Sequence, residues 1–282
     1  MGKLRERMKR DMEIRDFSPN TQQAYLHQVK ALARYFGRAP DGLTLEEIHT
    51  YQLHLIRERK IASSSLAQAV AALRFFYGVT CPKDWDIKQI PYPKRRRRLP
   101  VVFNQTELLR LFDAVQNFKH RAILMTLYAA GLRVSEVVHL RISDIDSQRM
   151  MIFVHQGKGR KDRYVTLSHR LLGVLREYWK LERPGHWLFP GQDGQRPLTR
   201  ASVHKFFKKA VRKTGLIKPI TVHCIRHSYA THLLESGVDI RKIQLLLGHR
   251  SLRSTQIYTH VARNDLDGTP SPLDLLPDAI EP

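Results

Sequence analysis

The front part of the chain carries apolar residues at helical spacing between residues 18 and 79. The first stripe consists of Tyr25, Val29, Leu32 and Phe36. Steps of four, three and four place these side chains on one face of a helix, which must be buried against another element. Ser18 can cap this helix and Pro19 can occupy its first turn. The pattern therefore predicts a helix that begins near residue 18.

Two further helices are predicted by capping boxes, in which a hydroxyl side chain and a Glu or Gln three residues later bind backbone N–H groups. Thr44 with Glu47 forms one such pair, and Ser65 with Gln68 forms another. Apolar stripes follow at Ile48, Tyr51 and Leu55, and at Val70, Leu73 and Tyr77. Short helices can bury these stripes against one another. Residues 18–79 are therefore predicted to form a small helical bundle.

The rear part of the chain combines helical stripes with one short β signal. Residues 150–154 and 162–167 are predicted to be two strands, joined by a turn that contains glycines and lysines. An apolar helix ends at Gly131 before them, and helices follow at 168–181, 199–214, 223–235 and 239–247. We therefore predict a mainly α fold of the α+β class. It contains a small N-terminal helical bundle and a larger, mostly helical domain with a small β-sheet.

The charge of the chain indicates its partner. The 282 residues include 48 Lys and Arg against 26 Asp and Glu, a net charge of +22. Such an excess needs a polyanion, and nucleic acid fits better than a membrane because the charge is spread along helices as well as gathered in tracts. The strongest tract, Lys94 to Arg98, lies among prolines. Taken alone, it is a phosphate-binding segment, a solvated cluster or a localisation signal.

Cysteine content and hydropathy indicate the cellular setting. Cys81 and Cys224 are too few and too far apart for a disulfide framework or a four-ligand zinc site. The N-terminus is charged and lacks the apolar run of a signal peptide. No stretch reaches the roughly 18 apolar residues of a membrane span. The sequence predicts a soluble cytoplasmic protein with no membrane partner.

Four segments carry side chains suited to phosphate chemistry, and three of them are described first. In GLRVSEVV, Arg133 is either an exposed capping residue or a rigid phosphate ligand. Lys158, between two glycines at the predicted hairpin tip, is either a turn residue or an amine that reaches a leaving oxygen. His249 and Tyr258 follow the last predicted helix. Tyr258 is either an ordinary aromatic or a nucleophile whose phenolate is stabilised by nearby cations.

The helix that begins at residue 223 contains three histidines and an arginine. His223 and Arg226 are three residues apart and share a helical face, where an acid or base beside an arginine suits phosphate chemistry. His223 and His227 have the i, i+4 spacing of a zinc helix. No Glu follows His223, so zinc is not predicted. We assign the purely structural role to His227 or His232 rather than to His223.

The order and types of these residues resemble the tyrosine recombinase family, also called phage-type integrases. The resemblance spans essentially the whole chain. It implies a catalytic set that consists of Arg133, Lys158, His223, Arg226, His249 and Tyr258. It also implies that DNA strands are cut and rejoined through a 3′-phosphotyrosine made by Tyr258, without a metal ion or any cofactor.

The same resemblance implies domains and partners. The expected parts are a core-binding (SAM-like helical) DNA-binding domain at 1–93, a basic linker at 94–100, a catalytic domain at 101–263 and an acidic tail at 264–282. The expected DNA-binding residues are Lys94, Arg95, Arg96, Arg97, Arg98 and Lys161. The expected partner is double-stranded DNA with two recombination sites. The protein is expected to bind this DNA as a homotetramer and to be a monomer or a weak oligomer without DNA. Its expected location is the cytoplasm, at the nucleoid.

Two alternative functions remain open at this point. A type IB topoisomerase would use the same tyrosine, arginines and histidine to relax supercoils without a second duplex. A non-catalytic DNA-binding regulator would keep the fold and form no covalent adduct. The tail resembles that of integron integrases, but the segment between Trp187 and Arg200 is too short for the extra helix of those enzymes. Integron function is therefore not assigned.

Overall fold

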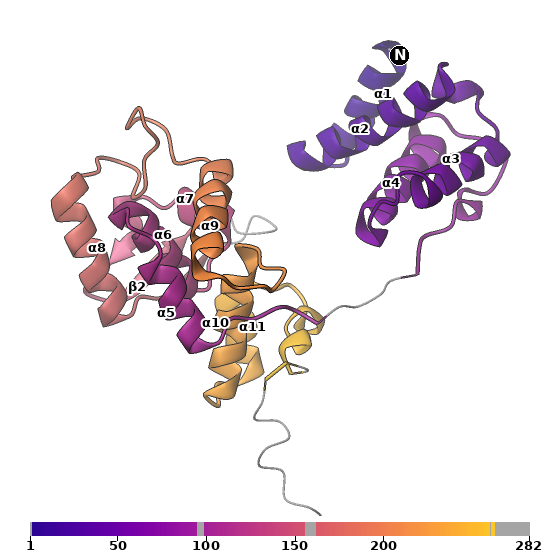
Figure 1. Ribbon diagram of the computed structural model, residues 1–282. Helices are drawn as coiled ribbons and strands as arrows, with labels where there is room; N and C mark the ends of the chain where they lie inside the picture. The colour runs from indigo at the N-terminus through magenta and orange to yellow at the C-terminus, as the bar shows by residue number, and fades with distance from the viewer. Residues whose placement is uncertain (1, 95–98, 156–161, 260, 263–282) are drawn as a thin grey trace, which may run out of the picture. The chain divides into compact units, whose positions relative to one another are not determined.

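The computed structural model describes residues 2–94, 99–155, 162–259 and 261–262. The chain forms two compact units, of which the first ends at Arg98 and the second begins at Leu99 (Figure 1). Each unit has its own buried apolar cluster. Helices dominate both units and a small sheet lies in the second, so the predicted fold class is confirmed.

The first unit is a bundle of four α-helices. They are α1 (Gly2–Glu13), α2 (Pro19–Phe36), α3 (Leu45–Arg57) and α4 (Ser63–Phe75), and a π-helical turn η2 (Phe76–Thr80) and a short 3₁₀ turn η3 (Ile87–Gln89) follow. The hydroxyl of Ser18 accepts a hydrogen bond from the backbone N–H of Thr21, which caps α2 as predicted. Thr44 and Glu47 form the predicted capping box at the start of α3. The α2 stripe packs chiefly against α4.

Two predictions for this unit were wrong. Helix α1 was not predicted, yet Met8 and Met12 on it are buried in the bundle core. Leu4 packs against the same core, and the steps of four from Leu4 to Met8 and Met12 were a usable helical signal within this charged stretch. The predicted capping box at Ser65 is absent, because α4 begins two residues earlier, at Ser63. Its N-cap is Ala62, which makes no side-chain hydrogen bond.

The second unit is built around α6 (Phe118–Ala129), which packs against both α8 and α10. The other helices are α5 (Gln105–Asp113), α7 (Val134–Val138), α8 (His169–Glu182), α9 (Arg200–Thr214), α10 (His223–Glu235) and α11 (Ile240–Leu247). Ser168, Thr199 and Asp239 cap α8, α9 and α11 through their side chains. The hydroxyl of Ser228 on α10 accepts a hydrogen bond from the N–H of Phe103 at 2.8 Å. This bond fixes the start of the unit on α10.

A three-stranded antiparallel sheet lies in the second unit, in the order β1-β2-β3. Its strands are β1 (Ile145–Asp146), β2 (Met151–Val154) and β3 (Arg163–Thr166), of which β2 and β3 form the predicted hairpin. Ile152 pairs with Val165, and both side chains are buried. Arg163 lies on the same face of β3 as Val165, because side chains two residues apart share a face. A cation therefore points inward from the strand.

The turn between α6 and α7 requires a glycine. Gly131 has φ +59°, a region that other residues rarely occupy. A Cβ at this position would lie 2.3 Å from two ring carbons of Tyr229 on α10. The missing side chain lets the turn approach α10 closely. The carbonyl oxygen of Gly131 accepts a hydrogen bond from Nη1 of Arg226 on α10 at 2.6 Å.

Candidate active site

The carboxylate of Glu136 organises the cationic part of the site. Arg163 donates to it twice, from Nη1 to Oε1 and from Nη2 to Oε2, each at 2.9 Å. Arg133 donates from its backbone N–H to Oε2 at 2.8 Å and from Nη1 to Oε1 at 2.7 Å. Nη1 of Arg226 lies 3.7 Å from Oε2. One buried carboxylate therefore holds guanidinium groups from three separate segments.

Arg226 is fixed by backbone carbonyls as well as by charge. Its side chain is 2% exposed, and its guanidinium donates to the carbonyl oxygens of Gly131 and Leu247. Gly131 lies just after the C-cap of α6 and Leu247 ends α11, so the guanidinium joins two helix ends to α10. Carbonyls at helix C-termini carry partial negative charge and are good acceptors for a cation. The group is held rigidly where it lies.

The network shifts the pKa values of its members. Burial alone would raise the pKa of Glu136, but the hydrogen bonds and charge of Arg163, followed by those of Arg133, lower it to about 2. Burial and the charge of Arg133 lower the pKa of Arg226 to about 10. Both groups remain ionised near neutral pH. The site therefore keeps a net positive charge, as a phosphate-binding site needs.

Two of the predicted histidines lie beside this network. His249 follows the left-handed Gly248 at the end of α11, and its Nδ1 lies 2.9 Å from the hydroxyl of Thr255. Burial and the charges of Arg226 and Arg133 lower its pKa to about 4. His223 lies at the exposed start of α10, where partial burial of its ring and then the charge of Arg226 lower its pKa. Because His223 is exposed, solvent weakens the effect of the Arg226 charge on its pKa.

Tyr258 is buried in this part of the molecule, with 3% of its surface exposed. It ends a short 3₁₀ helix, η6 (Gln256–Tyr258), which packs against α10. Its hydroxyl lies 3.1 Å from Nδ1 of His227. Burial raises the pKa of the phenol, while the charges of Arg226 and Arg133 act in the opposite direction. Both guanidinium groups are therefore close enough to the phenol to influence its pKa.

The structure thus gathers most of the predicted catalytic residues. Arg133, Arg226, His249 and Tyr258 come together, and His223 lies at the edge of this group. Predicted residues that lie outside the described part of the chain are Lys158, Lys161, Arg95, Arg96, Arg97 and Arg98. Lys94 is described and is exposed at the end of the first unit.

Three residues of the site were missed by sequence reasoning. Glu136 stands three positions after Arg133 in the quoted motif, and a carboxylate at that spacing on a helix start was a usable signal. Arg163 is a cation at an inward-facing position of a strand, which is unusual without an anionic partner. His227 was given a structural role, yet it contacts the phenol oxygen of Tyr258.

No group of three or more His, Cys, Asp or Glu side chains suited to a metal ion occurs within the described ranges. His223 and His227, the pair with zinc-helix spacing, have ring centroids 4.5 Å apart. Among the helices of the described part, none is long and apolar enough to cross a membrane.

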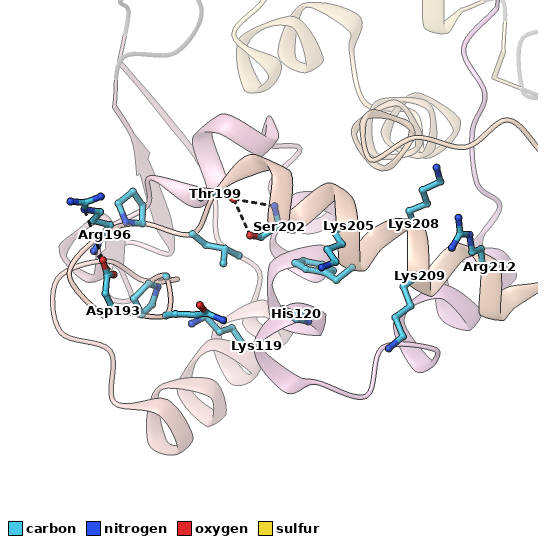
Figure 2. A pocket seen from close by; sticks show the side chains of 16 residues that line it. Lys119, His120, Asp193, Arg196, Thr199, Ser202, Lys205, Lys208, Lys209 and Arg212 are labelled. Carbon is cyan, nitrogen blue, oxygen red and sulfur yellow. Dashed lines mark hydrogen bonds and ion pairs between the residues drawn. The ribbon is translucent and has the colours of Figure 1, made fainter.

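A second cationic feature is an open pocket between α9, the start of α6 and the loop before α9, here called the basic pocket. Its charged lining consists of Lys119, Asp193, Arg196, Lys205, Lys208, Lys209 and Arg212, beside His120. Figure 2 shows the lysines and Arg212 spaced along α9, with Lys119 and His120 on α6. The imidazole of His120 stacks on Phe206 with centroids 4.0 Å apart. This pocket shares no lining residue with the Glu136 network.

The family of the chain follows from its similarity to known proteins. Residues 102–265 match the phage integrase family, and residues 4–87 match the phage integrase N-terminal SAM-like domain. The first match alone spans more than half of the chain. The chain belongs to the phage integrase family. The predicted family and the predicted class of enzyme, a DNA-cleaving and rejoining tyrosine recombinase, are confirmed.

Relatives match the chain over nearly its full length. A Sinorhizobium fredii protein, provisionally named integrase/recombinase y4qK, is 51% identical over 98% of this chain and 90% of its own. Tyrosine recombinase XerC of Lacticaseibacillus casei is 34% identical over 88% of this chain and 90% of its own. A solved lambda integrase dimer bound to a COC′ core site has a TM-score of 0.75 at 19% identity, over 90% and 96% of the two chains. That likeness shows the integrase fold.

Proposed function

We propose that Tyr258 attacks a DNA phosphodiester and forms a 3′-phosphotyrosine, and that the reverse reaction joins the strand to a new partner. One observation carries this proposal. Arg133 and Arg226 meet at the carboxylate of Glu136, and both exert their charge on the phenol of Tyr258. A nucleophile and two phosphate-binding cations thus share one location.

Each group has a role in the cleavage step. As the phenol oxygen bonds to phosphorus, negative charge grows on the two non-bridging oxygens, and the guanidiniums of Arg133 and Arg226 neutralise it. His249 and His223 would hydrogen-bond the same oxygens. We assign protonation of the departing 5′ oxygen to Lys158, on the basis of its place between Gly157 and Gly159 in the sequence. The ester retains the bond energy, so rejoining requires no ATP and no metal ion.

The proposed reaction also determines how many protomers and DNA sites must come together. Exchange between two duplexes needs four strand cleavages, and we propose that four protomers on two recombination sites supply them. Residues 1–93 would bind DNA as the core-binding domain, 94–100 as the basic linker and 101–263 as the catalytic domain. The acidic tail, 264–282, would pack on a neighbouring protomer. The protein would act in the cytoplasm at the nucleoid.

The basic pocket is a candidate surface for DNA phosphates, together with Lys94 to Arg98 and Lys161. Six Lys and Arg side chains line it against one carboxylate, that of Asp193. A plot of log affinity against log salt concentration has a negative slope, and each phosphate contact that is lost makes this slope shallower by about 1. We expect this change for Lys208→Ala or Arg212→Ala, measured by fluorescence anisotropy on duplex DNA. Lys180→Ala, an exposed lysine on α8 outside the pocket, should leave the slope unchanged.

The proposed reaction is tested with a suicide substrate, a duplex nicked near the cleavage site so that the released fragment diffuses away. The wild type should form a covalent protein–DNA species that resists SDS, and Tyr258→Phe should form none. Tyr164→Phe, at an exposed position on β3, is the matched control and should behave as the wild type. Bound DNA without an adduct would favour the regulator. Relaxation without exchange between two sites would favour the topoisomerase.

A further inference from the structure

The phenol of Tyr258 must lose its proton when its oxygen bonds to phosphorus. Burial raises the pKa of this phenol, so spontaneous ionisation near neutral pH is rare. A base in contact with the hydroxyl removes that barrier, provided that the two atoms lie within about 2.6–3.2 Å. The described site contains a side chain that meets this condition.

His227 is in hydrogen-bond contact with the nucleophile. Its Nδ1 lies 3.1 Å from the hydroxyl oxygen of Tyr258, and the two ring centroids are 5.7 Å apart. Arg226 and His223 face it from its own helix α10, and Tyr258 faces it from η6. Burial, followed by the influence of His223 and Arg226, lowers the pKa of His227 to about 4. Its imidazole is therefore neutral at physiological pH and has a nitrogen that can accept a proton.

The other cationic and imidazole groups of the site are less suited to this task. The guanidiniums of Arg133 and Arg226 have no acceptor nitrogen. Nδ1 of His249 already lies 2.9 Å from the hydroxyl of Thr255. His223 lies at the exposed start of α10, one helical turn before His227. Geometry therefore favours His227 as the partner of the phenol proton.

We propose that His227 is a catalytic residue, which accepts the phenol proton of Tyr258 during strand cleavage and returns it during rejoining. The Oη–P bond forms, the P–O5′ bond breaks, and its electron pair goes to the 5′ oxygen, which takes a proton from the acid assigned above to Lys158. On reversal, the 5′-hydroxyl gives a proton to that amine, and the departing phenolate regains its proton from the His227 imidazolium. This inference rests on the proposed function.

Single-turnover cleavage of the suicide substrate tests the proposal. General base catalysis contributes about 10²- to 10⁴-fold, so His227→Gln and His227→Ala should slow adduct formation by that factor with DNA affinity unchanged. His232→Asn is the matched control. His232 also lies on α10 and has its Nδ1 2.8 Å from a tyrosine hydroxyl, that of Tyr128, but it does not touch the nucleophile. This variant should cleave at the wild-type rate.

The pH profile separates a base from a residue that merely holds the ring. If His227 is the base, the variants should regain rate as rising pH ionises the phenol, and the difference from the wild type should shrink. A difference that stays constant with pH, or variants that cleave at the wild-type rate, would overturn the proposal. If the wild type itself forms no adduct, the proposed function fails instead.

A measurement on the unmodified protein does not depend on whether the variants fold. Nitrogen-15 NMR of histidine-labelled wild type reports which ring nitrogen carries the proton. The proposal requires an unprotonated Nδ1 on His227, which accepts the Tyr258 O–H. A protonated Nδ1, which donates to the phenol oxygen, would contradict it.

Discussion

The arginine side and the tyrosine side of the site are held in different ways. Arg226 and Arg163 each contact both a backbone carbonyl and Glu136, and they lie on an α-helix and a β-strand. Tyr258 lies on a three-residue 3₁₀ helix, and a side-chain hydrogen bond to His227 holds its hydroxyl. The electrostatic part of the site is thus built into the fold, whereas the nucleophile sits on a short element.

This difference suits the proposed reaction. Charge stabilisation acts best when its donors need no reorganisation at the moment of reaction. A nucleophile that remains covalently attached to DNA while strands are exchanged benefits from an element that can shift, and short 3₁₀ segments have poorer hydrogen-bond geometry than α-helices. Changes on the arginine side should therefore affect folding strongly, whereas changes on the tyrosine side should affect chemistry more than folding.

The largest effect is expected for Glu136→Ala. Removing one partner of a buried ion pair costs about 3–5 kcal/mol, because the guanidiniums are left in the interior without their anion. Urea unfolding should show this loss for the second unit. Glu177→Ala is the control, since that carboxylate pairs with Lys180 on the exposed surface of α8 and should cost about 1 kcal/mol or less. Equal losses in the two variants would contradict the account of a buried network.

The next largest effect is expected for Gly131→Ala. The left-handed backbone costs about 1 kcal/mol for a residue with a Cβ, and overpacking against Tyr229 adds about 1–3 kcal/mol. Chemical denaturation should reveal a loss in this range, together with slower cleavage because Arg133 follows the turn. Gly173→Ala lies on α8, where a Cβ meets no atom within 4 Å, and should stabilise the protein slightly. A neutral Gly131→Ala would show that the turn tolerates a side chain.

A smaller effect is expected from acid on the tyrosine side. Burial is the main cause that lowers the pKa of His227 and of His249 from 6.5 to about 4. Between these pH values the unfolded chain binds more protons than the folded one, so their contribution to stability is lost as the pH falls from 6.5 to 4. Unfolding curves at several pH values should show a weaker acid dependence in His249→Asn. His204→Asn, at an exposed position, should parallel the wild type.

The smallest effect is expected for Thr255→Val, which removes the hydroxyl that contacts His249. A hydrogen bond of this kind contributes about 1 kcal/mol to stability. We expect a loss of that size in urea unfolding, together with a larger relative loss in cleavage rate if His249 must be oriented toward the phosphate. A loss comparable to that of Glu136→Ala would remove the contrast between the two sides of the site.

Local signals in the sequence predicted many helix starts of the fold but not all of them. Ser18 and Thr44 cap helices as predicted, because a cap depends on a few adjacent residues. The helices predicted from residues 168 and 239 begin one residue later, because Ser168 and Asp239 are their N-caps. Ser65 failed as a cap because serines also stand at positions 63 and 64, and a local pattern does not decide which one begins the helix. The packing of α2 against α4 joins residues that are far apart in the sequence, and the local pattern of residues around a helix start does not contain this information.

The site was predictable as a set of residues but not as a network. Arg226 and Tyr258 were identified from motifs, and they do come together. Glu136 binds guanidiniums from the α6–α7 turn, from β3 and from α10, and no local spacing shows that these segments meet. The contact of His227 with Tyr258 spans 31 positions and likewise depends on how η6 packs on α10.

The most direct test of the central claim is a structure of the covalent adduct trapped on a suicide substrate. The account predicts phosphorus bonded to Oη of Tyr258, with the guanidiniums of Arg133 and Arg226 donating to the non-bridging oxygens of that same phosphate. A phosphotyrosine at another tyrosine, or a Tyr258-linked phosphate that neither guanidinium contacts, would contradict it.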